Sequence, residues 1–491
     1  MATESTPVFP VEISGLIIDK LVLRSDFLLG CLEPPSRKAL RACSLTCKYF
    51  ERLARPHLFH TTYIELAKYD DIPPHAGSVK AWMELLDRDK NASHGRQRLS
   101  QHIKSLHVSF GYYYREVSIL PLPTSSSGYT FAQIFSELDR LDSLALFGLF
   151  AAPADLEIEA TLLQREMVRL IGTSKSLRSI TTCSEKEFFL EIANSMHSFG
   201  HITHLHLPHR LRKPLELSQL CWFPNLQGLD VEQYTRFVDD DIPITSTTPL
   251  KHPSFSLKML KLSPQDAYTR RENPDIIGLT PLLDFFRRHS QIANCDPFSN
   301  LELLDVYISV GSDRDTLALA SVLESMPRLK SFALSAYNRD TPYHQLGQLQ
   351  IGQRSRDTWH HLTRLSLYFN GSYDTVADDI MEIFNEISAF NRLESVHLDF
   401  CSDQVTYDAE KDEYQSLCYL WEWLGQRFGN PQAYPKLRSV IIEFEAVLKG
   451  LRHLTFYERL KAGGQIKADI RRALATPFMS LGHGRTFRLL D

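Results

Sequence analysis

The chain has 491 residues, of which 43% are hydrophobic and 23% are charged, close to the averages of soluble globular proteins. Its 54 Lys and Arg residues nearly balance its 59 Asp and Glu residues, so a net charge of −5 provides no general attraction for nucleic acid or for an anionic membrane. Residues 1–7 lack the basic and apolar regions of a signal peptide, and no stretch approaches the roughly 18 apolar residues of a membrane span. We therefore expect an intracellular protein of the cytoplasm, the nucleus or both, which binds neither nucleic acid nor membrane.

Two amphipathic helices are predicted near the N-terminus. Pro10 suits the start of the first, and its apolar residues recur every four positions at Ile13, Ile17 and Leu21. In the second helix, Ser36 is the expected N-cap, the chain should leave the helix near Pro56, and apolar positions follow at steps of three and four: Leu40, Cys43, Cys47, Phe50 and Ala54. Two such short helices form one apolar seam that they cannot bury alone, so we expect a partner to cover it.

The pattern F-P-x-E-I-x-x-x-I-I-x-x-L from Phe9, followed by A-L-R-A-C-S-L-T-C-K-Y-F and R-P-H-L-F-H, resembles the F-box in the form common in large fungal families. The resemblance implies binding to a Skp-type adaptor and, through it, to a cullin ubiquitin ligase. The implied adaptor contacts are Phe9, Pro10, Ile13, Ile17, Leu40, Cys43, Cys47 and Phe50. The chain departs from the family where Phe50 stands near a common Trp, and where residues 24–37 form a longer connection. The alternative is a helical hairpin packed against the rest of the chain.

A short L-x-x-L-x-L run recurs from about residue 100 onward. The second apolar positions of its copies are Leu106, Leu144, Ile180, Leu205, Leu229, Leu260, Leu304, Phe332, Leu365, Val396 and Val440. This looks like a divergent leucine-rich repeat, which implies short parallel strands whose leucines point inward. Helices are predicted between strands at 129–138, 279–289, 316–324, 378–387 and 414–427. The spacing exceeds the usual ~20 to 29 residues, so we expect an irregular solenoid, with another stacked α/β fold as the alternative.

The fold class is accordingly α/β: a small N-terminal helical F-box-like module followed by an irregular leucine-rich-repeat solenoid. The expected boundaries are 5–66 for the module, 67–100 for a connecting segment with one helix near 79–87, 101–445 for the repeats, and 446–491 for a C-terminal cap and tail. The cap would include a basic helix at 465–474.

Residues that alternate with the inward leucines should lie on the exposed, concave side of the repeats. Ser105 and His107 are early examples, and we expect target-binding residues at His204, His206, Asp230, Lys261, Asp305, Tyr307, Arg364 and His397. Their mixed charge suits a protein or peptide surface better than a polyanion. Two alternatives are that these positions are merely solvated, or that loops at 238–255 and 336–356 bind the target.

No motif supports an enzyme. The chain has no G-x-S-x-G, H-E-x-x-H, Walker or G-x-G-x-x-G sequence, and its eight cysteines include no C-x-x-C pair. His201, His204, His206 and His209 resemble a metal cluster, but no nearby Cys or carboxylate completes a zinc site. We expect no cofactor and no metal.

The leading hypothesis is a substrate-recognition subunit of a cullin-type ubiquitin ligase, in which the module binds the adaptor and the repeats bind an unknown protein substrate. A repeat scaffold with no link to ubiquitin is the alternative, and a hydrolase whose site forms only in three dimensions is a third, weaker hypothesis.

Overall fold

The computed structural model describes a subset of the chain's residues. These are residues 11–22, 24–25, 31–65, 67–68, 76–91, 98–109, 118–119, 138, 140–147, 157–182, 188, 192, 195, 199–207, 215–232, 237–238, 255–263, 279–293, 296–309, 313–337, 360–370, 380–381, 383–385, 387, 392–408, 413–415, 418–449, 464–465, 468, 472, 475–478 and 486–490. The chain divides into two compact units, Met1–Lys213 and Pro214–Asp491.

The first unit begins with a helical module of α1 (Val11–Lys20), α2 (Pro34–Thr46) and α3 (Lys48–Phe59). Between α1 and α2, β1 (Arg24–Ser25) pairs antiparallel with β2 (Cys31–Leu32). The prediction of a single second helix is wrong, because Cys47 adopts extended angles (φ −161°, ψ 163°) and separates α2 from α3.

The predicted ends of that second helix are also wrong. Glu33 occupies the N-cap position and Pro34 begins α2, where its missing N–H costs nothing, so Ser36 lies buried inside the helix. At the other end, α3 continues through Pro56 to Phe59. Leu53 and Leu58, on either side of this proline, both pack against the module core, and this packing holds the last turn helical.

The remainder of the first unit is a parallel sheet with flanking helices. Its strand order is β3 (Thr61–Glu65), β5 (Ser105–Ser109), β7 (Ser143–Phe147), β8 (Ser179–Thr182) and β9 (His204–Leu207). The helical segments are α4 (Ala76–Asn91), η1 (Leu99–His102) and α6 (Glu157–Thr173), and β4 (Ala67–Lys68) pairs antiparallel with β6 (Ser118–Ile119). The helix α4 extends the one expected at 79–87, whereas α6 was not predicted.

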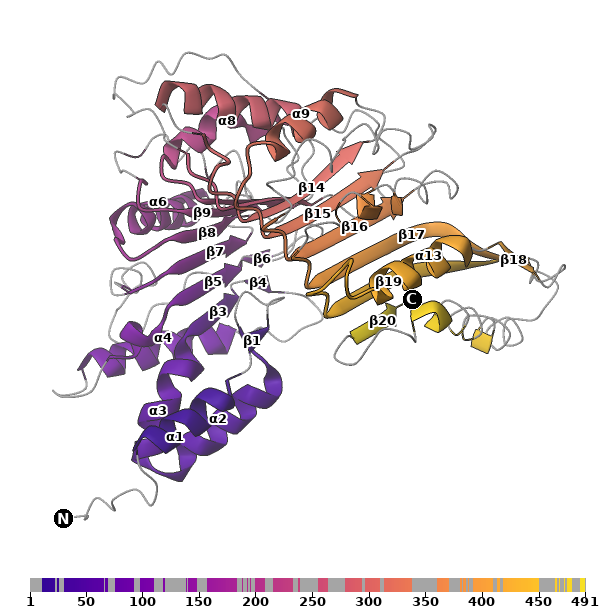
Figure 1. The fold of residues 1–491 in the computed structure, drawn as a ribbon. Helices are drawn as coiled ribbons and strands as arrows, with labels where there is room; N and C mark the ends of the chain where they lie inside the picture. Colours follow the sequence, from indigo (N-terminus) through magenta and orange to yellow (C-terminus); the bar gives the residue numbers. More distant parts are fainter. Residues whose placement is uncertain are drawn as a thin grey trace. The chain divides into compact units, whose positions relative to one another are not determined.

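The second unit contains a longer parallel sheet (Figure 1). Its strand order is β11 (Gly228–Glu232), β13 (Met259–Ser263), β14 (Leu303–Ser309), β15 (Ser331–Tyr337), β16 (Arg364–Asn370), β17 (Ser395–Asp408), β19 (Ser439–Lys449) and β20 (Thr486–Leu490). A short β18 (Glu413–Gln415) pairs antiparallel with β17, and β10 (Leu215–Glu216) pairs with β12 (Phe237–Val238). The helical segments are η4 (Leu217–Trp222), α8 (Leu279–Ala293), α9 (Asp313–Leu323), α13 (Cys418–Gly429) and η8 (Thr476–Phe478).

The register of these strands confirms the predicted repeats. In the first unit the Cα partners run Leu106, Leu144, Ile180, Leu205, and in the second they run Leu229, Leu260, Leu304, Phe332, Leu365, Val396, Val440. These are the second apolar positions of the eleven sequence copies. Each unit is therefore an α/β repeat array of the leucine-rich-repeat type.

Backbone hydrogen bonds stack one repeat on the next. The carbonyl oxygen of Lys104 accepts from the N–H groups of both Asp142 and Ser143, and the carbonyl of Asp142 accepts from Arg178 and Ser179. The same arrangement recurs in the second unit from Gln227 onward. The start of each strand is therefore bound to the backbone of the preceding repeat. These hydrogen bonds set the distance between repeats, so the segments that join them can differ in length.

Two sheet strands lie outside the predicted repeat range. The first, β3, pairs with β5 although residues 61–65 fall in the range assigned to the F-box-like module, and β20 pairs with β19 from within the predicted tail. Neither strand has the leading leucine of the repeat. They extend the repeat arrays beyond the predicted limits of 101 and 445.

The leucine side of each sheet packs against helices. In the second unit the ring of Phe400 on β17 lies 5.2 Å from that of Trp421 on α13, and Phe255 lies 5.0 Å from Phe286 on α8. The predicted helices at 279–289, 316–324 and 414–427 correspond to α8, α9 and α13, with β18 occupying the start of the last range. Within 378–387 the described residues, 380–381, 383–385 and 387, are helical, which agrees with the predicted helix. The predictions at 129–138 and 465–474, and the loops 238–255 and 336–356, fall largely outside the described residues. Among described helices, none is long and apolar enough to cross a bilayer.

Candidate binding surfaces

The helical module has a small core of its own. Ile18, Leu40 and Ala54 are fully buried at its centre, and half-buried Cys43 and Phe50 pack against them. The prediction that Leu40 contacts an adaptor is therefore wrong, because its side chain has no exposed surface. Leu40 holds the helices together instead.

Several apolar side chains of the module remain exposed. On α1, Ile13, Leu16 and Ile17 keep 45%, 61% and 43% of their surface, and on α2 Leu45 keeps 86%. Spacings of three and four residues place the α1 side chains on one side of the helix. We call these four residues the docking edge. Cys47, at the break between α2 and α3, is also exposed.

The predicted adaptor contacts thus divide into three groups. Ile13, Ile17 and Cys47 are exposed, Cys43 and Phe50 are half-buried against the module core, and Leu40 is buried. Phe9 and Pro10 lie outside the described residues. Leu16 and Leu45 were not among the predicted contacts. Leu16 fits the apolar stripe of α1, whereas Leu45 is five residues from Leu40 and lies on the other side of α2.

The second unit aligns four predicted target-binding residues in one row across the sheet. Asp230 is the Cα partner of Lys261, and Lys261 is the partner of Asp305. The row continues through Ala333 and Ser366 to His397. Alternation along the strands directs these side chains away from the helix-covered leucines.

A second row lies two residues further along each strand. It contains the predicted Tyr307 and three residues that were not predicted, Tyr368, Asp399 and Glu443, which are partners in turn across β16, β17 and β19. The same alternation could have identified all three, since each follows an inward-facing apolar residue (Leu367, Leu398 or Ile442) by one position. Arg364 lies in a third row, two residues before the first row on each strand, and its Cα partner is Ser395.

Contacts between the rows form an acidic and aromatic patch on the second unit, which we define as Asp230, Asp305, Tyr368, His397, Asp399 and Glu443. The His397 Nε2 lies 3.3 Å from Glu443 Oε1, a distance that suits an ion pair when the imidazole is protonated, and its ring lies 5.5 Å from that of Tyr368 in an edge-on arrangement. The Lys261 Nζ lies 4.0 Å from Asp230 Oδ2.

Burial shapes the electrostatics of this acidic patch. Burial raises the pKa of Asp305 to about 6, against an opposing effect of the Lys261 charge and with a smaller increase from the charge of Asp230. The pKa of Tyr368 is also raised, first by burial and then by the charge of Asp305. Lys261, between Asp230 and Asp305 in the first row, already supplies one positive charge, whereas Asp399 and Glu443 lie further along the sheet beside Tyr368 and His397.

The outward positions of the first unit differ from one strand to the next. His204 and His206 on β9 are half-exposed, as predicted, but Ser105 and His107 on β5 are buried and the expectation of exposure is wrong for them. The His107 ring lies 6.5 Å from Phe147, and its Nε2 lies 3.1 Å from Ser105 Oγ. Burial lowers the pKa of His107 to about 4.

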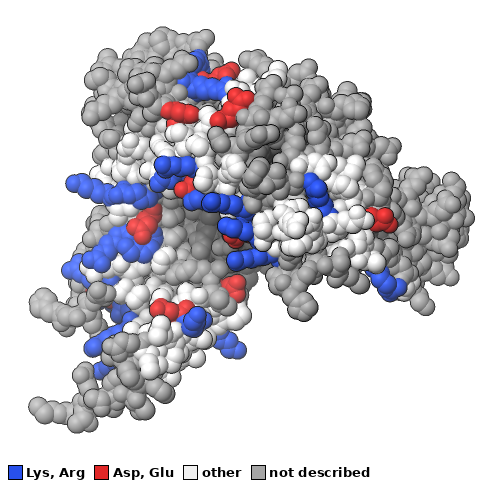
Figure 2. All heavy atoms as spheres, viewed as in Figure 1, with Lys and Arg blue, Asp and Glu red and all other residues white. Residues whose placement is uncertain are grey.

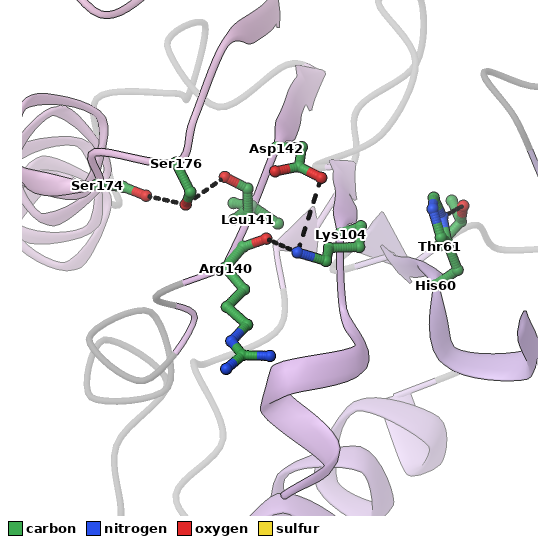
Figure 3. A network of polar contacts seen from close by, with 8 residues as sticks. All are labelled: His60, Thr61, Lys104, Arg140, Leu141, Asp142, Ser174 and Ser176. Atoms are coloured by element: carbon green, nitrogen blue, oxygen red, sulfur yellow. Dashed lines mark hydrogen bonds and ion pairs between the residues drawn. The ribbon is translucent and has the colours of Figure 1, made fainter. Parts of the chain in front are cut away.

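The turns that lead into the first unit's strands carry polar contacts (Figure 3). Lys104 Nζ donates to the carbonyl of Arg140 at 3.1 Å and lies 3.8 Å from Asp142 Oδ2, while Ser176 Oγ donates to the carbonyl of Leu141 at 2.9 Å. In the second unit, Lys330 and Glu302 make a similar pair between adjacent repeats. These contacts link successive repeats, and Figure 2 shows basic side chains lying beside acidic ones on the face in view.

The histidines that resembled a metal cluster have other contacts. The ring of His201 binds the carbonyl of Ile171 at 2.7 Å, and His204 Nδ1 lies 2.9 Å from Thr203 Oγ1. Within the described ranges, no three His, Cys, Asp or Glu side chains are grouped closely enough to hold a metal ion, and His209 lies outside those ranges.

Comparison with known proteins identifies no family for this chain. No protein-family model matches it, and no curated protein matches it. Among solved structures, it is similar to TLR13 in complex with ssRNA13, at 13% identity and a TM-score of 0.30, covering 80% of this chain and 51% of that one. It is also similar to Toll in the Toll–Spatzle complex of Drosophila, at 14% identity and a TM-score of 0.19, covering 73% and 55%. The chain spans about half the length of these proteins, and with such low TM-scores the repeat architecture rests on the strand register.

Proposed function

We propose that this protein is a substrate receptor of a cullin-type ubiquitin ligase, which binds a Skp-type adaptor through the docking edge and a protein target through the repeats. The observation that carries the proposal is the exposure of Ile13, Leu16 and Ile17 on one side of α1, in the segment whose sequence resembles the F-box. The module core is complete without these side chains, since Ile18 and Leu40 already fill it. An apolar helix side beside a finished core is a suitable binding surface for a second polypeptide.

The energetic gain from such docking is substantial. Full burial of a Leu or Ile side chain contributes about 1.5–3 kcal/mol, and each docking-edge side chain still exposes close to half or more of its surface. Four side chains therefore offer on the order of 4 kcal/mol before the cost of association. Further contacts, including the exposed Cys47, would be needed for a stable complex.

The second half of the proposal concerns the target. The acidic patch presents Asp305, Asp399 and Glu443 beside Tyr368, and these groups favour a target segment with Lys or Arg side chains. No catalytic group is required of this chain. It would act by holding the target near the ligase, which raises the target's effective concentration at a separate catalytic centre.

Binding to a purified Skp-type adaptor tests the first half. We expect the full chain to bind at micromolar concentration and Leu16→Glu to reduce affinity at least tenfold, because a charge would have to be buried in the apolar contact. Leu317→Glu is the matched control: Leu317 is 58% exposed on α9, so the same change there should leave binding intact. If wild-type protein ignores the adaptor, or both variants lose binding equally, the receptor proposal fails.

The alternative is a repeat scaffold with no ubiquitin link. The acidic patch supports the scaffold function equally, because target binding by the patch requires no adaptor. The two functions separate when Leu16→Glu and a charge-reversal variant, Asp399→Lys, are compared. A receptor loses target ubiquitination with either variant, whereas a scaffold loses target binding only with Asp399→Lys.

A further inference from the structure

A pocket of about 670 Å³ lies within the first unit, between the helical module, β3 and α4. Its walls come from three separate stretches of chain: α2 and α3, the strand β3, and α4 with the start of η1. This volume is in the range of small-molecule and side-chain binding sites. It shares no residue with the docking edge.

The charge in this pocket is predominantly positive. Four arginines line it, Arg37, Arg41, Arg55 and Arg88, against two carboxylates, Glu51 and Asp89. The carboxylate of Asp89 is already engaged, since it accepts from Arg55 at 2.6 Å and from the backbone N–H of Leu99.

Two of these arginines are available to a ligand. Arg37 and Arg41 are exposed on the same side of α2, four residues apart, and among the described residues neither guanidinium makes an ion pair. The guanidinium of Arg88 lies 3.8 Å from Glu84 but is 81% exposed, so that pair is weak and readily exchanged.

A second observation points to a missing hydrogen-bond acceptor. The indole Nε1 of Trp82, which lines the pocket, is buried and has no hydrogen-bond partner among the described residues. Nearly all buried polar groups are satisfied in folded proteins, so this N–H lacks the acceptor it would ordinarily have. The atom itself has almost no accessible surface, so Trp82 is a reporter beside the pocket and not a contact of its ligand. The pKa of the nearby His102 is lowered, first by burial and then by the positive charge of Arg55, while the charge of Asp89 opposes this.

The remaining walls are apolar and aromatic. Tyr63 and Leu85 line the pocket while keeping 54% and 43% of their surface exposed, and Leu58, Phe59 and Leu99 also contribute. An occupant would therefore meet flat apolar surface next to the arginines.

We infer that this pocket binds an anionic group, a phosphate or a carboxylate, carried on an aromatic or aliphatic body. Arg37 and Arg41 would bind the anionic oxygens, since guanidinium groups donate in pairs to such groups. The apolar body would pack on Tyr63 and Leu85, which keep about half of their surface exposed in the pocket wall. The inference does not depend on the proposed ligase role.

The test uses the full chain labelled with ¹⁵N at its five Trp indoles, which give separable N–H signals. Trp82→Phe identifies the Trp82 signal by its loss. Phenyl phosphate should shift that signal at concentrations on the order of 1 mM, whereas phenol, the neutral analogue, should leave it in place. Inorganic phosphate should bind more weakly than phenyl phosphate, because it lacks the apolar body.

Matched arginine variants establish the contact. Arg41→Gln should weaken phenyl phosphate about fivefold, the loss expected for one partly solvated charge-assisted hydrogen bond. Arg52→Gln removes the same charge from an exposed position on α3 that does not line the pocket, and should have no effect. Both positions are at the surface, so neither variant threatens folding.

Several results would overturn the inference. These are an unmoved Trp82 signal at about 10 mM phenyl phosphate, equal weakening by both arginine variants, or phenol binding as tightly as phenyl phosphate. A phosphotyrosine peptide compared with phenyl phosphate identifies the source of the anion: tighter binding of the peptide assigns a polypeptide ligand, and equal or weaker binding assigns a small molecule.

Discussion

Leu40 and Leu45 lie on the same helix, α2, in opposite surroundings. Leu40 has no exposed surface and Leu45 exposes 86%. Truncation to Ala removes three carbon atoms in each case, at about 0.8 kcal/mol for each buried carbon. For Leu40 this gives about 2.4 kcal/mol, and the cavity left between Ile18 and Ala54 raises the expected loss of unfolding free energy to about 3 kcal/mol. For Leu45 the same calculation gives about 0.3 kcal/mol.

Hydrogen exchange followed by mass spectrometry measures this difference within the module. Amides of α1, α2 and α3 should exchange about 100-fold faster in Leu40→Ala, because about 3 kcal/mol corresponds to roughly that change in the opening equilibrium. In Leu45→Ala their exchange rates should stay nearly unchanged. The adaptor should show the reverse preference, with Leu45→Ala weakening binding through direct contact. Equal exchange in the two variants would refute the assignment of Leu40 to the core and Leu45 to the surface.

Three further changes test packing and charge elsewhere. Gly425→Ala should cost about 2 kcal/mol in thermal unfolding, because a Cβ at this position would lie 2.6 Å from the carbonyl oxygen of Pro477; an unchanged melting temperature would contradict that close approach. Asp305 has a folded pKa of about 6 against an ordinary value of 3.8, so wild-type stability should fall as pH rises from about 4 to about 6, and Asp305→Asn should lose this component. His107 acts in the opposite direction: its folded pKa of about 4 lies below the ordinary 6.5, so stability should fall as pH decreases from 6.5 to 4, and His107→Asn should abolish that loss in urea titrations at each pH.

The repeats were predictable because their signal is local. A leucine two residues from another on a strand must share its side of the sheet, and eleven copies of that pattern lead to eleven strands in the expected register. The break at Cys47 was not predictable in the same way. Apolar spacing of three and four continues unchanged through it from Cys43 to Phe50, so periodicity alone cannot distinguish one helix from two.

The two surfaces differ in how far the sequence reveals them. The acidic patch follows from alternation, because each of its residues is next to an inward-facing apolar residue of a repeat strand, and Tyr368 could have been predicted by extending the row. The arginine pocket has no comparable signal. Arg41, Trp82 and Tyr63 come from segments whose proximity depends on how the module packs against the first repeat, and no periodicity relates them.

His107 and His397 show where local pattern stops being informative. Both occupy the outward position of a repeat strand, and both were expected to be exposed. His397 keeps 22% of its side-chain surface exposed beside Glu443, whereas His107 is 4% exposed and is flanked by the rings of Tyr63 and Phe147. Alternation determines the side of the sheet to which a side chain points. Whether that side chain is exposed depends on how other parts of the chain pack over it. A prediction of binding residues from repeat pattern therefore needs independent evidence of exposure, because the residues of the acidic patch are half-buried and Ser105 and His107 on β5 are buried.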